Sequence, residues 1–307
     1  MTFFWIVGSL ALIFLSLVFL FPTLVFRWIF KRPKRSKKVP KFYIGSPHYV
    51  ASRKGMALMD QIGHQDIFMK SSDGLTLHAY FYPAATPSSK FVLGIHGYRS
   101  YARPEFGPYI AFYRSLGYNV LLPDDRAHAP SQGKYIGFGV LDRLDCLQWA
   151  QQMVSSYGND IKILIHGVSM GAATVLAASG ETLPLQVKGI IADCGYTSAW
   201  DILNFQLRKI PGKKALLKRV ERICQKKAGY DFHHFTPLEQ VQKATLPILF
   251  VHGGKDEMVP SSMVYALYHA CSSRKCLLYV KEAAHAESIC LAKKEYEQLI
   301  TNFFSMV

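Results

Sequence analysis

Residues 161–178 read IKILIHGVSMGAATVLAA, and this stretch decides the fold. Its first part is a mostly apolar run typical of a buried strand, and the small residues after Gly171 favour a helix. Between them lies Gly167-Val168-Ser169-Met170-Gly171, a G-x-S-x-G sequence. A serine at the apex of a sharp strand-to-helix turn needs neighbours without side chains, because strand and helix otherwise cannot approach closely. The context therefore predicts a nucleophile elbow with Ser169 at its apex.

Two further motifs follow in chain order. The apolar run at 247–251 continues into HGGKD, which places Asp256 just past the carboxyl end of a predicted strand. A second short run, at 276–280, precedes the loop that contains His285, and the final predicted helix follows this loop. The order serine, acid, histidine differs from the two main serine protease orders and is typical of α/β-hydrolases.

These three side chains suit acyl transfer. A serine hydroxyl is a poor nucleophile unless a base takes its proton during the attack, and we assign that base to His285. Asp256 would orient the imidazole and stabilise the imidazolium; we prefer it to Glu257 because this loop needs a short, fixed acid. His285 is chosen because it alone lies in the loop after the last strand; the competing histidines are His96, His128, His166 and His252.

The oxyanion site is expected beside the serine. The predicted strand at 91–95 ends in His-Gly-Tyr, and we assign the oxyanion donors to the backbone N–H groups of Met170 and Tyr98. Four residues are expected to support the site: His96, Gly97, Gly167 and Gly171. The sequence has neither the Cys/His spacing of a zinc site nor a phosphate loop or dinucleotide fingerprint, so we expect no metal and no cofactor.

Strands alternate with helices along most of the chain. Strands are predicted at 91–95, 119–122, 161–166, 188–193, 247–251 and 276–280, and helices near 106–116, 140–156, 170–179, 261–271 and 289–304. The alternation predicts an α/β fold with a mainly parallel central sheet and helices on both faces. Upstream, Asp73-Gly74 joins two β-like runs as a hairpin. Residues 197–243 interrupt the alternation, which predicts an inserted helical cap.

The amino terminus is expected to be a membrane anchor. Residues 3–26 carry no charged side chain and are long enough to cross a hydrocarbon core about 30 Å thick as a transmembrane helix. A cleaved signal peptide fits less well, because no basic residue precedes the run and the run is too long. Eight basic residues follow it: Arg27, Lys31, Arg32, Lys34, Arg35, Lys37, Lys38 and Lys41.

This charge asymmetry predicts the topology and the domains. The positive-inside rule places the large domain in the cytoplasm, and the basic flank suits anionic headgroups better than nucleic acid. We therefore expect an anchor and basic segment at 1–41 and a hydrolase domain at 42–307. The 307-residue chain is 50% hydrophobic and 13% aromatic, which excludes a disordered chain, and its net charge is +15. Its six cysteines form no C-x-x-C pair and indicate reduced thiols.

With these motifs assigned, the chain resembles the α/β-hydrolase superfamily. It is most similar there to bacterial membrane-anchored hydrolases of the serine-aminopeptidase-like and acyl-esterase-like group. The segments that carry the resemblance are 95–98, 124–133, 167–171, 250–256 and 284–285. Many relatives have glycine where this chain has Ala127, Ala129 and Ala284. The resemblance implies a serine hydrolase without metal or organic cofactor.

Three functions follow as hypotheses. The first is a membrane-tethered serine hydrolase of acyl esters, lipid-like ones included, acting through Ser169, His285 and Asp256. The second is a serine peptidase, aminopeptidase or thioesterase of the same fold. The third is a catalytically silent membrane-bound binding or scaffold protein, which the intact set of three residues disfavours. The oligomeric state has no signature in the sequence.

Overall fold

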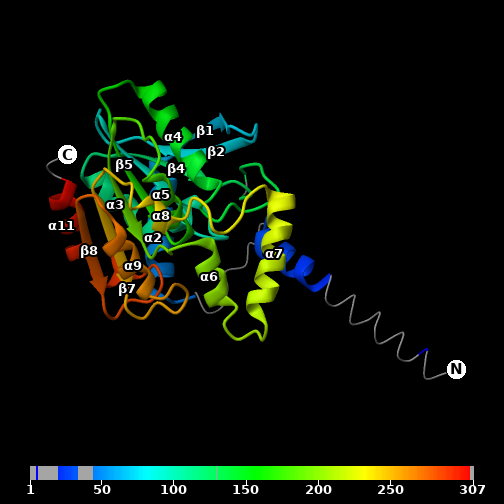
Figure 1. Cartoon of the computed structure of the whole chain (residues 1–307). Helices are drawn as coiled ribbons and strands as arrows, with labels where there is room; N and C mark the ends of the chain where they lie inside the picture. Colours follow the sequence, from blue (N-terminus) through cyan, green and yellow to red (C-terminus); the bar gives the residue numbers. More distant parts are fainter. Residues whose placement is uncertain (1–4, 6–19, 34–43, 129, 305–307) are drawn as a thin grey trace.

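The computed structural model describes residues 5, 20–33, 44–128 and 130–304 (Figure 1). Its centre is a sheet of eight strands in the order β1-β2-β4-β3-β5-β6-β7-β8. The strands are β1 (Gln65–Lys70), β2 (Thr76–Tyr82), β3 (Lys90–Ile95), β4 (Asn119–Asp124), β5 (Lys162–Val168), β6 (Val187–Asp193), β7 (Ile248–Gly253) and β8 (Lys275–Val280). The pairs β1–β2 and β2–β4 are antiparallel and every other pair is parallel. The predicted mainly parallel sheet is confirmed.

Helices cover both faces of this sheet because its strands are apolar on both sides. In β3, Val92 and Leu93 are both fully buried but belong to different core clusters, since successive strand side chains point to opposite faces. The cluster around Val92 receives side chains from α2 (Pro47–Ile62), α3 (Ala102–Ser115) and α11 (Lys293–Phe304). The cluster around Leu93 receives them from α4 (Asp142–Tyr157), α5 (Met170–Ala178) and α9 (Ser262–Ala270).

Between β6 and β7 the chain forms α6 (Ala199–Gln206), α7 (Lys213–Ala228) and α8 (Pro237–Gln240), within the region expected to be a cap. Helix α7 is amphipathic: it buries Leu216, Leu217, Val220 and Cys224 and turns most of its lysines and arginines to solvent. The buried side joins a third core cluster, which also contains Met170 beside the elbow serine. This packing places α6 and α7 over the carboxyl-terminal edge of the parallel strands.

The local turn predictions agree with the structure. The turn between β1 and β2 has Gly74 at φ +83°, a left-handed conformation that favours glycine, and the strand pairing runs from Lys70 opposite Thr76. The final predicted helix is instead two helices, α10 (Ser288–Leu291) and α11, with Ala292 between them.

All six cysteines are free thiols.

Most of the predicted membrane span lies outside the described residues. Of residues 3–26, the structure describes residue 5 and residues 20–26, and residues 20–30 are helical. Among the described parts of the chain, no helix is long and apolar enough to cross a membrane. Residues 34–41 of the basic flank also lie outside the described ranges.

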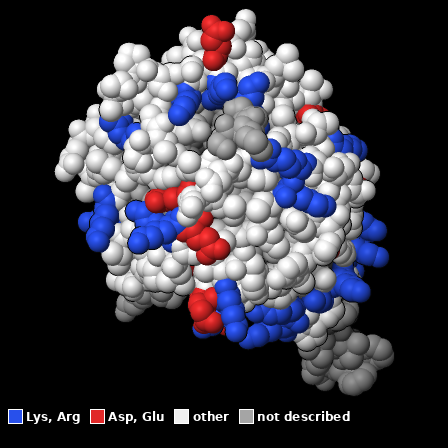
Figure 2. Space-filling model, turned by 90° about the vertical axis from the view of Figure 1, so that its left-hand side faces the viewer, with Lys and Arg blue, Asp and Glu red and all other residues white. Residues whose placement is uncertain are grey.

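On one face of the molecule, lysine and arginine side chains are spread over the surface. Figure 2 shows the side on which α11 lies, where lysine and arginine side chains form several separate groups with acidic side chains between some of them. On this face the excess charge is therefore distributed, rather than gathered along one groove.

Candidate active site

Ser169 occupies a strained turn between β5 and α5. Its backbone has φ +58° and ψ −116°, a conformation that a residue with a Cβ adopts only when its surroundings enforce it. The glycines on either side allow the close approach that enforces it. A Cβ on Gly171 would lie 2.0 Å from the carbonyl oxygen of Ile95, and one on Gly167 would lie 2.1 Å from the carbonyl oxygen of Gly171. Both glycines are thus required by backbone contact.

The structure brings Ser169, His285 and Asp256 together. The Oγ atom of Ser169 lies 2.9 Å from Nε2 of His285, and Nδ1 of His285 lies 2.7 Å from Oδ2 of Asp256. The other carboxylate oxygen of Asp256 accepts the backbone N–H groups of Met258 and Val259, at 2.9 and 2.8 Å. The acid is therefore held in one orientation, with Nδ1–H of the imidazole donating to it and Nε2 facing the serine hydroxyl. The competing acid next in the chain is exposed.

The electrostatics of this pair favour a base at His285. Burial disfavours the imidazolium, but the hydrogen bond and the charge of Asp256 outweigh it and raise the pKa of His285 above its ordinary 6.5. Burial likewise raises the pKa of Asp256, but its contacts with His285 and the backbone outweigh burial and lower the pKa below 3.8. Asp256 is thus ionised at neutral pH, and His285 binds a proton more strongly than a free imidazole.

The other candidate histidines have different partners. His96 forms hydrogen bonds with the backbone of Gly97 and Asp125, and His128 forms one with the backbone N–H of Arg99. His166 is bonded to the hydroxyls of Tyr113 and Tyr296, and His252 to the carbonyl of Val259. Burial lowers the pKa of His166 to about 3, so it stays neutral in the core. His96 and His252 fix the loops after β3 and β7, as expected for histidines beside glycines at strand ends.

The two residues assigned as oxyanion donors belong to segments that pass close to Ser169. Met170 is the first residue of α5, where helix geometry leaves the N–H without an intrahelical partner and the helix dipole favours negative charge. The loop after β3 passes the serine closely, because a Cβ on Gly97 would lie 3.1 Å from Cβ of Ser169. Tyr98 follows in this loop; burial raises the pKa of its phenol to about 12, so the hydroxyl keeps its proton.

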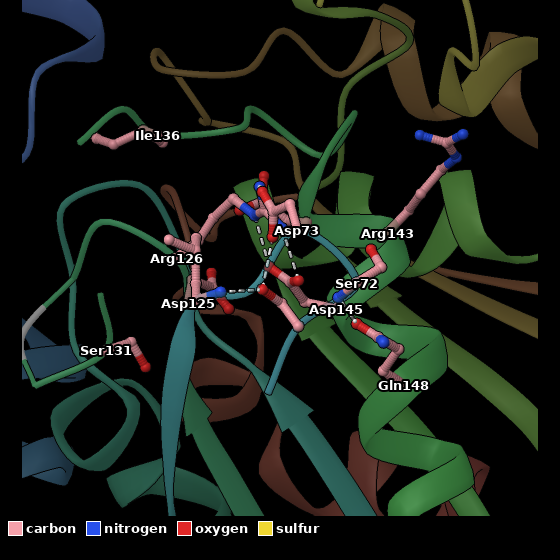
Figure 3. A network of polar contacts seen from close by, with 12 residues as sticks. Ser72, Asp73, Asp125, Arg126, Ser131, Ile136, Arg143, Asp145 and Gln148 are labelled. Carbon is pink, nitrogen blue, oxygen red and sulfur yellow. Dashed lines mark hydrogen bonds and ion pairs between the residues drawn. The ribbon is translucent and has the colours of Figure 1, made fainter. Parts of the chain in front are cut away.

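A buried polar network supports the loop after β4 (Figure 3). Arg126 points from this loop to two carboxylates, as Figure 3 shows. Its Nε and Nη2 donate to Asp145 on α4 at 2.6 and 2.7 Å, and its Nη1 donates to Asp73 at 3.0 Å. The network ties the β1–β2 turn, the β4 loop and α4 to one another.

The departures from the family's glycine pattern have different outcomes. Ala127 adopts φ +62°, the left-handed conformation that glycine prefers, and its N–H donates to the carbonyl of Gln132 at 2.9 Å. An alanine in this conformation costs roughly 1 kcal/mol more than glycine, which the buried network around it must offset. Ala127 therefore has a backbone conformation that glycine favours. Residue 129 lies outside the described residues.

Sequence reasoning missed two buried acids near the site. Glu105 on α3 accepts the N–H of Gly97 at 3.4 Å, so it helps to hold the start of the oxyanion loop. Asp193, the last residue of β6, accepts the hydroxyls of Tyr109 and Tyr296 at 3.2 and 3.0 Å, and burial raises its pKa to about 6. Its position at the carboxyl end of a predicted strand was the available signal, because acids there lie at the active-site edge of a parallel sheet.

Cys194 follows Asp193 and lies next to the base. Its backbone has φ +51°, and its sulfur lies 4.0 Å from Nε2 of His285. Burial raises the pKa of the thiol well above 9, so it is protonated. Cys194, Asp256 and His285 present possible metal ligands within 4.8 Å of one another. The hydrogen bond between the last two already uses one ligand atom of each, which fits a hydrogen-bonded relay better than a metal centre.

Comparison with known proteins gives the family. Residues 131–304 match the model of the prolyl oligopeptidase family. The protein YqkD of Bacillus subtilis (strain 168), described as uncharacterized, is 28% identical over 198 residues, which span 64% of this chain and 65% of the relative, just under two thirds. An uncharacterized membrane protein of Saccharomyces cerevisiae (strain ATCC 204508 / S288c), YNL320W, is 27% identical over 58% of each chain.

A solved structure agrees with the fold. The Pyrococcus furiosus esterase Pf2001 superposes with a TM-score of 0.67 at 21% identity, covering 90% of this chain and 98% of the esterase. The resemblance to the α/β-hydrolase superfamily is confirmed. The family model matches more than half of the chain, and the matched region contains Ser169, Asp256 and His285. This α/β-hydrolase has the architecture of a serine hydrolase and belongs to the prolyl oligopeptidase family.

Proposed function

We propose that this serine hydrolase cleaves carboxylic esters through an acyl-enzyme formed on Ser169. The relay of 2.9 Å from Ser169 to His285 and 2.7 Å from His285 to Asp256 is the observation that carries the proposal. Both distances lie within the reach required of a nucleophile, its base and the group that orients the base.

In the first half of the reaction, Oγ of Ser169 attacks the ester carbonyl carbon while Nε2 of His285 takes the hydroxyl proton. The carbonyl oxygen becomes an oxyanion that accepts the N–H groups of Met170 and Tyr98. The bond to the alcohol oxygen then breaks, and His285 gives its proton to this leaving group. In the second half, water attacks the acyl carbon, His285 takes a proton from it and returns this proton to Oγ of Ser169, and a carboxylic acid leaves.

The electrostatics support this assignment of roles. The ionised carboxylate of Asp256 stabilises the imidazolium that forms at each attack. A single oxyanion donor is worth about 10²–10³ in rate in other hydrolases, because it meets charge that develops only in the transition state. The raised pKa of His285 predicts that turnover increases with pH until the imidazole is neutral.

A hollow on the surface of the cap favours an acyl substrate with an anionic group. A hollow of about 490 Å³ on the cap is lined by Trp200, Lys218, Glu221, Arg222, Gln225 and His233. Its two cations, Lys218 and Arg222, outnumber its one acid, which favours an anionic group. The ring centroids of Trp200 and His233 lie 4.7 Å apart, with the ring planes tilted by 35°. We therefore rank lipid-like esters with an anionic headgroup above neutral peptides as substrates.

Attachment to a membrane, with the domain on the cytoplasmic side, is part of the proposal. It is supported by the uncharged run at 3–26, the basic residues after it, and the exposed apolar side chains of Leu20, Leu24 and Trp28 on the helix at 20–30. The description of the yeast relative as a membrane protein adds to this support. Protease digestion of intact cells and of inside-out vesicles tests the topology, and digestion from outside the cell would overturn it.

A peptidase is the second candidate, because the matching family is described by a peptidase activity. The same three residues can cleave an amide when the amide nitrogen of the substrate is positioned to take the proton from His285. Turnover of aminoacyl p-nitroanilides that exceeds turnover of p-nitrophenyl esters would reverse the ranking of the two candidates.

Fluorophosphonate labelling of the full chain in mild detergent tests the proposed function. The expected result is labelling and turnover of p-nitrophenyl esters by the wild type, and loss of both in Ser169→Ala. The series of ester chain lengths then reports the size of the acyl site. Absence of labelling in a wild type that melts cooperatively would contradict the enzyme and favour a binding protein.

A further inference from the structure

The helix at residues 20–30 has two different faces. Phe26 and Phe30 are fully buried, and Ile29 is 4% exposed, in the third core cluster of the molecule. Leu24 and Trp28 are 60% and 67% exposed on the other side. The same cluster contains residues of α7 and Met170 next to the nucleophile. The described residues 20–30 of the segment assigned by sequence to the anchor are therefore packed into the hydrolase domain at its active-site end.

Aromatic rings connect this helix to the oxyanion loop. The ring of Phe30 lies 5.5 Å from that of Phe232 and nearly parallel to it, with an interplanar angle of 13°. It also lies 5.0 Å from the ring of Phe138, which in turn lies 5.2 Å from the ring of Tyr98. These rings form one row, from the helix to the residue that carries a proposed oxyanion donor.

Hydrogen bonds join the same two elements. The hydroxyl of Tyr98 donates to the carbonyl of Ile29 at 2.8 Å, and the guanidinium of Arg99 donates to the carbonyl of Trp28. The last carbonyls of a helix have no partner within it and form the negative end of its dipole, so a hydroxyl and a cation are suitable partners. The oxyanion loop thus caps the end of this helix.

The chain after the helix continues the contact. The N–H of Ile136 donates to the carbonyl of Phe30 at 2.8 Å, and the N–H of Arg32 donates to the carbonyl of Lys134 at 2.9 Å. The Arg32 side chain also donates to the carbonyl of Ser131 at 2.6 Å. Residues 30–33 therefore run along the loop after β4, which lies next to the oxyanion loop through the bond between Arg99 and His128.

We propose that residues 20–33 are a positioning element of the active site, which holds Tyr98 so that its backbone N–H meets the oxyanion. This inference rests on the proposed function, because it assumes acyl transfer at Ser169. The phenol and the N–H of Tyr98 belong to one residue, so fixing the ring by Ile29, Phe138 and Phe30 also limits where the N–H lies. The segment that precedes the domain thereby links membrane attachment to the rate of the chemical step.

The physical reason is preorganisation. Oxyanion donors accelerate a reaction because they are already in place when charge develops. A donor that must first be ordered lowers the activation free energy by less. The loop from Gly97 to Ser100 has a positive φ at Arg99. Its side chains contact Trp28, Ile29 and Phe138, and its backbone bonds to the side chains of His96, Glu105 and His128. Loss of these contacts is expected to lower kcat rather than to weaken binding of a short ester.

Four variants of the full chain in mild detergent test the proposal: Phe30→Ala, Phe30→Leu, Tyr98→Phe and Phe81→Ala. Phe30→Ala removes the ring next to Phe138, and Tyr98→Phe keeps the N–H but removes the bond to Ile29. Phe81→Ala is the matched control, because Phe81 is equally a buried phenylalanine but packs against Phe91 and Tyr157 in the core cluster around Leu93. The measurements are kcat and KM for a short p-nitrophenyl ester and the melting temperature.

We expect Phe30→Ala to lower kcat by about 10- to 100-fold, a part of the 10²–10³ that a whole oxyanion donor supplies. Tyr98→Phe is expected to lower kcat about 3- to 10-fold, with KM and melting temperature nearly unchanged. Phe81→Ala is expected to lower the melting temperature while kcat of the folded fraction stays unchanged. Phe30→Leu should restore most of the activity, because it refills the space of the ring.

The proposal is overturned if Tyr98→Phe keeps wild-type kcat while Phe30→Ala loses only stability, as the control does. If Phe30→Ala does not fold, Tyr98→Phe alone decides. This outcome differs from failure of the proposed function, in which the wild type itself has no turnover that depends on Ser169.

Discussion

Replacement of Asp193 by asparagine is expected to remove one contribution to the pH dependence of the unfolding free energy. Burial raises the pKa of this carboxyl from 3.8 to about 6, although Tyr109 and Tyr296 donate hydrogen bonds to it. The folded state therefore binds this proton more tightly than the unfolded state does. The stability it contributes is complete below about pH 3.8 and is lost as pH rises through about 6.

The magnitude follows from the shift. Each pKa unit corresponds to 1.36 kcal/mol, so a shift of about two units removes about 3 kcal/mol of unfolding free energy between pH 4 and pH 8. Asparagine has the shape of the protonated acid and stays neutral throughout. Asp193→Asn should therefore be close to the wild type in stability at pH 4 and about 3 kcal/mol more stable relative to it at pH 8. At about 2 °C per kcal/mol, this corresponds to about 6 °C in melting temperature.

Thermal or urea unfolding of both proteins at pH 4, 5, 6, 7 and 8 measures this difference in stability. Titrating groups common to both chains contribute equally to each and cancel in the difference. The control is Asp66→Asn, because the hydrogen bond from His78 lowers the pKa of Asp66, and the variant's relative stability should change with pH in the opposite direction. Parallel curves for wild type and Asp193→Asn would refute the reasoning. The negative charge of Asp193 also raises the pKa of His285, so the acidic limb of kcat/KM should move to lower pH in this variant.

Two further predictions follow from the elbow and its neighbour. In Gly171→Ala the new methyl would lie 2.0 Å from the backbone oxygen of Ile95, so we expect a lower melting temperature and at least 100-fold slower fluorophosphonate labelling. Labelling at the wild-type rate would contradict the close packing of α5 on the end of β3. The thiol of Cys194 is buried and its pKa is well above 9, so iodoacetamide at pH 8 should leave turnover unchanged. Cys194→Ala should keep kcat within a few-fold of the wild type. Rapid inactivation of the wild type by iodoacetamide, abolished in Cys194→Ala, would instead show an accessible thiolate.

Much of the site was predictable because its residues follow strong local patterns. Ser169 lies between an apolar strand and a small-residue helix, and Asp256 and His285 follow the strands β7 and β8. Parallel strands end at one edge of the sheet, so side chains just after them meet even when they lie 116 positions apart, as Ser169 and His285 do. Chain order and strand ends were thus sufficient to select these three residues from the competing acids and histidines.

Other features had no such pattern. Glu105 lies within α3 and reaches Gly97 only because α3 packs on the face of the sheet where the oxyanion loop begins. The uncharged run at 3–26 predicts a membrane helix, and hydropathy contains no signal that Phe26 and Phe30, at its end, would fit between α7 and the β4 loop. Those contacts depend on complementary shapes contributed by distant parts of the chain.

The sequence by itself determined the α/β class, the elbow, the order of the three candidate residues and the basic flank, because periodicity, turn residues and charge are local properties. Only the tertiary structure decided the strand order with β4 next to β3, the packing of residues 20–33 against the oxyanion loop, and the perturbed pKa values of Asp193 and His285. Burial and long-range contact set these properties, and neither exists until the whole chain has folded.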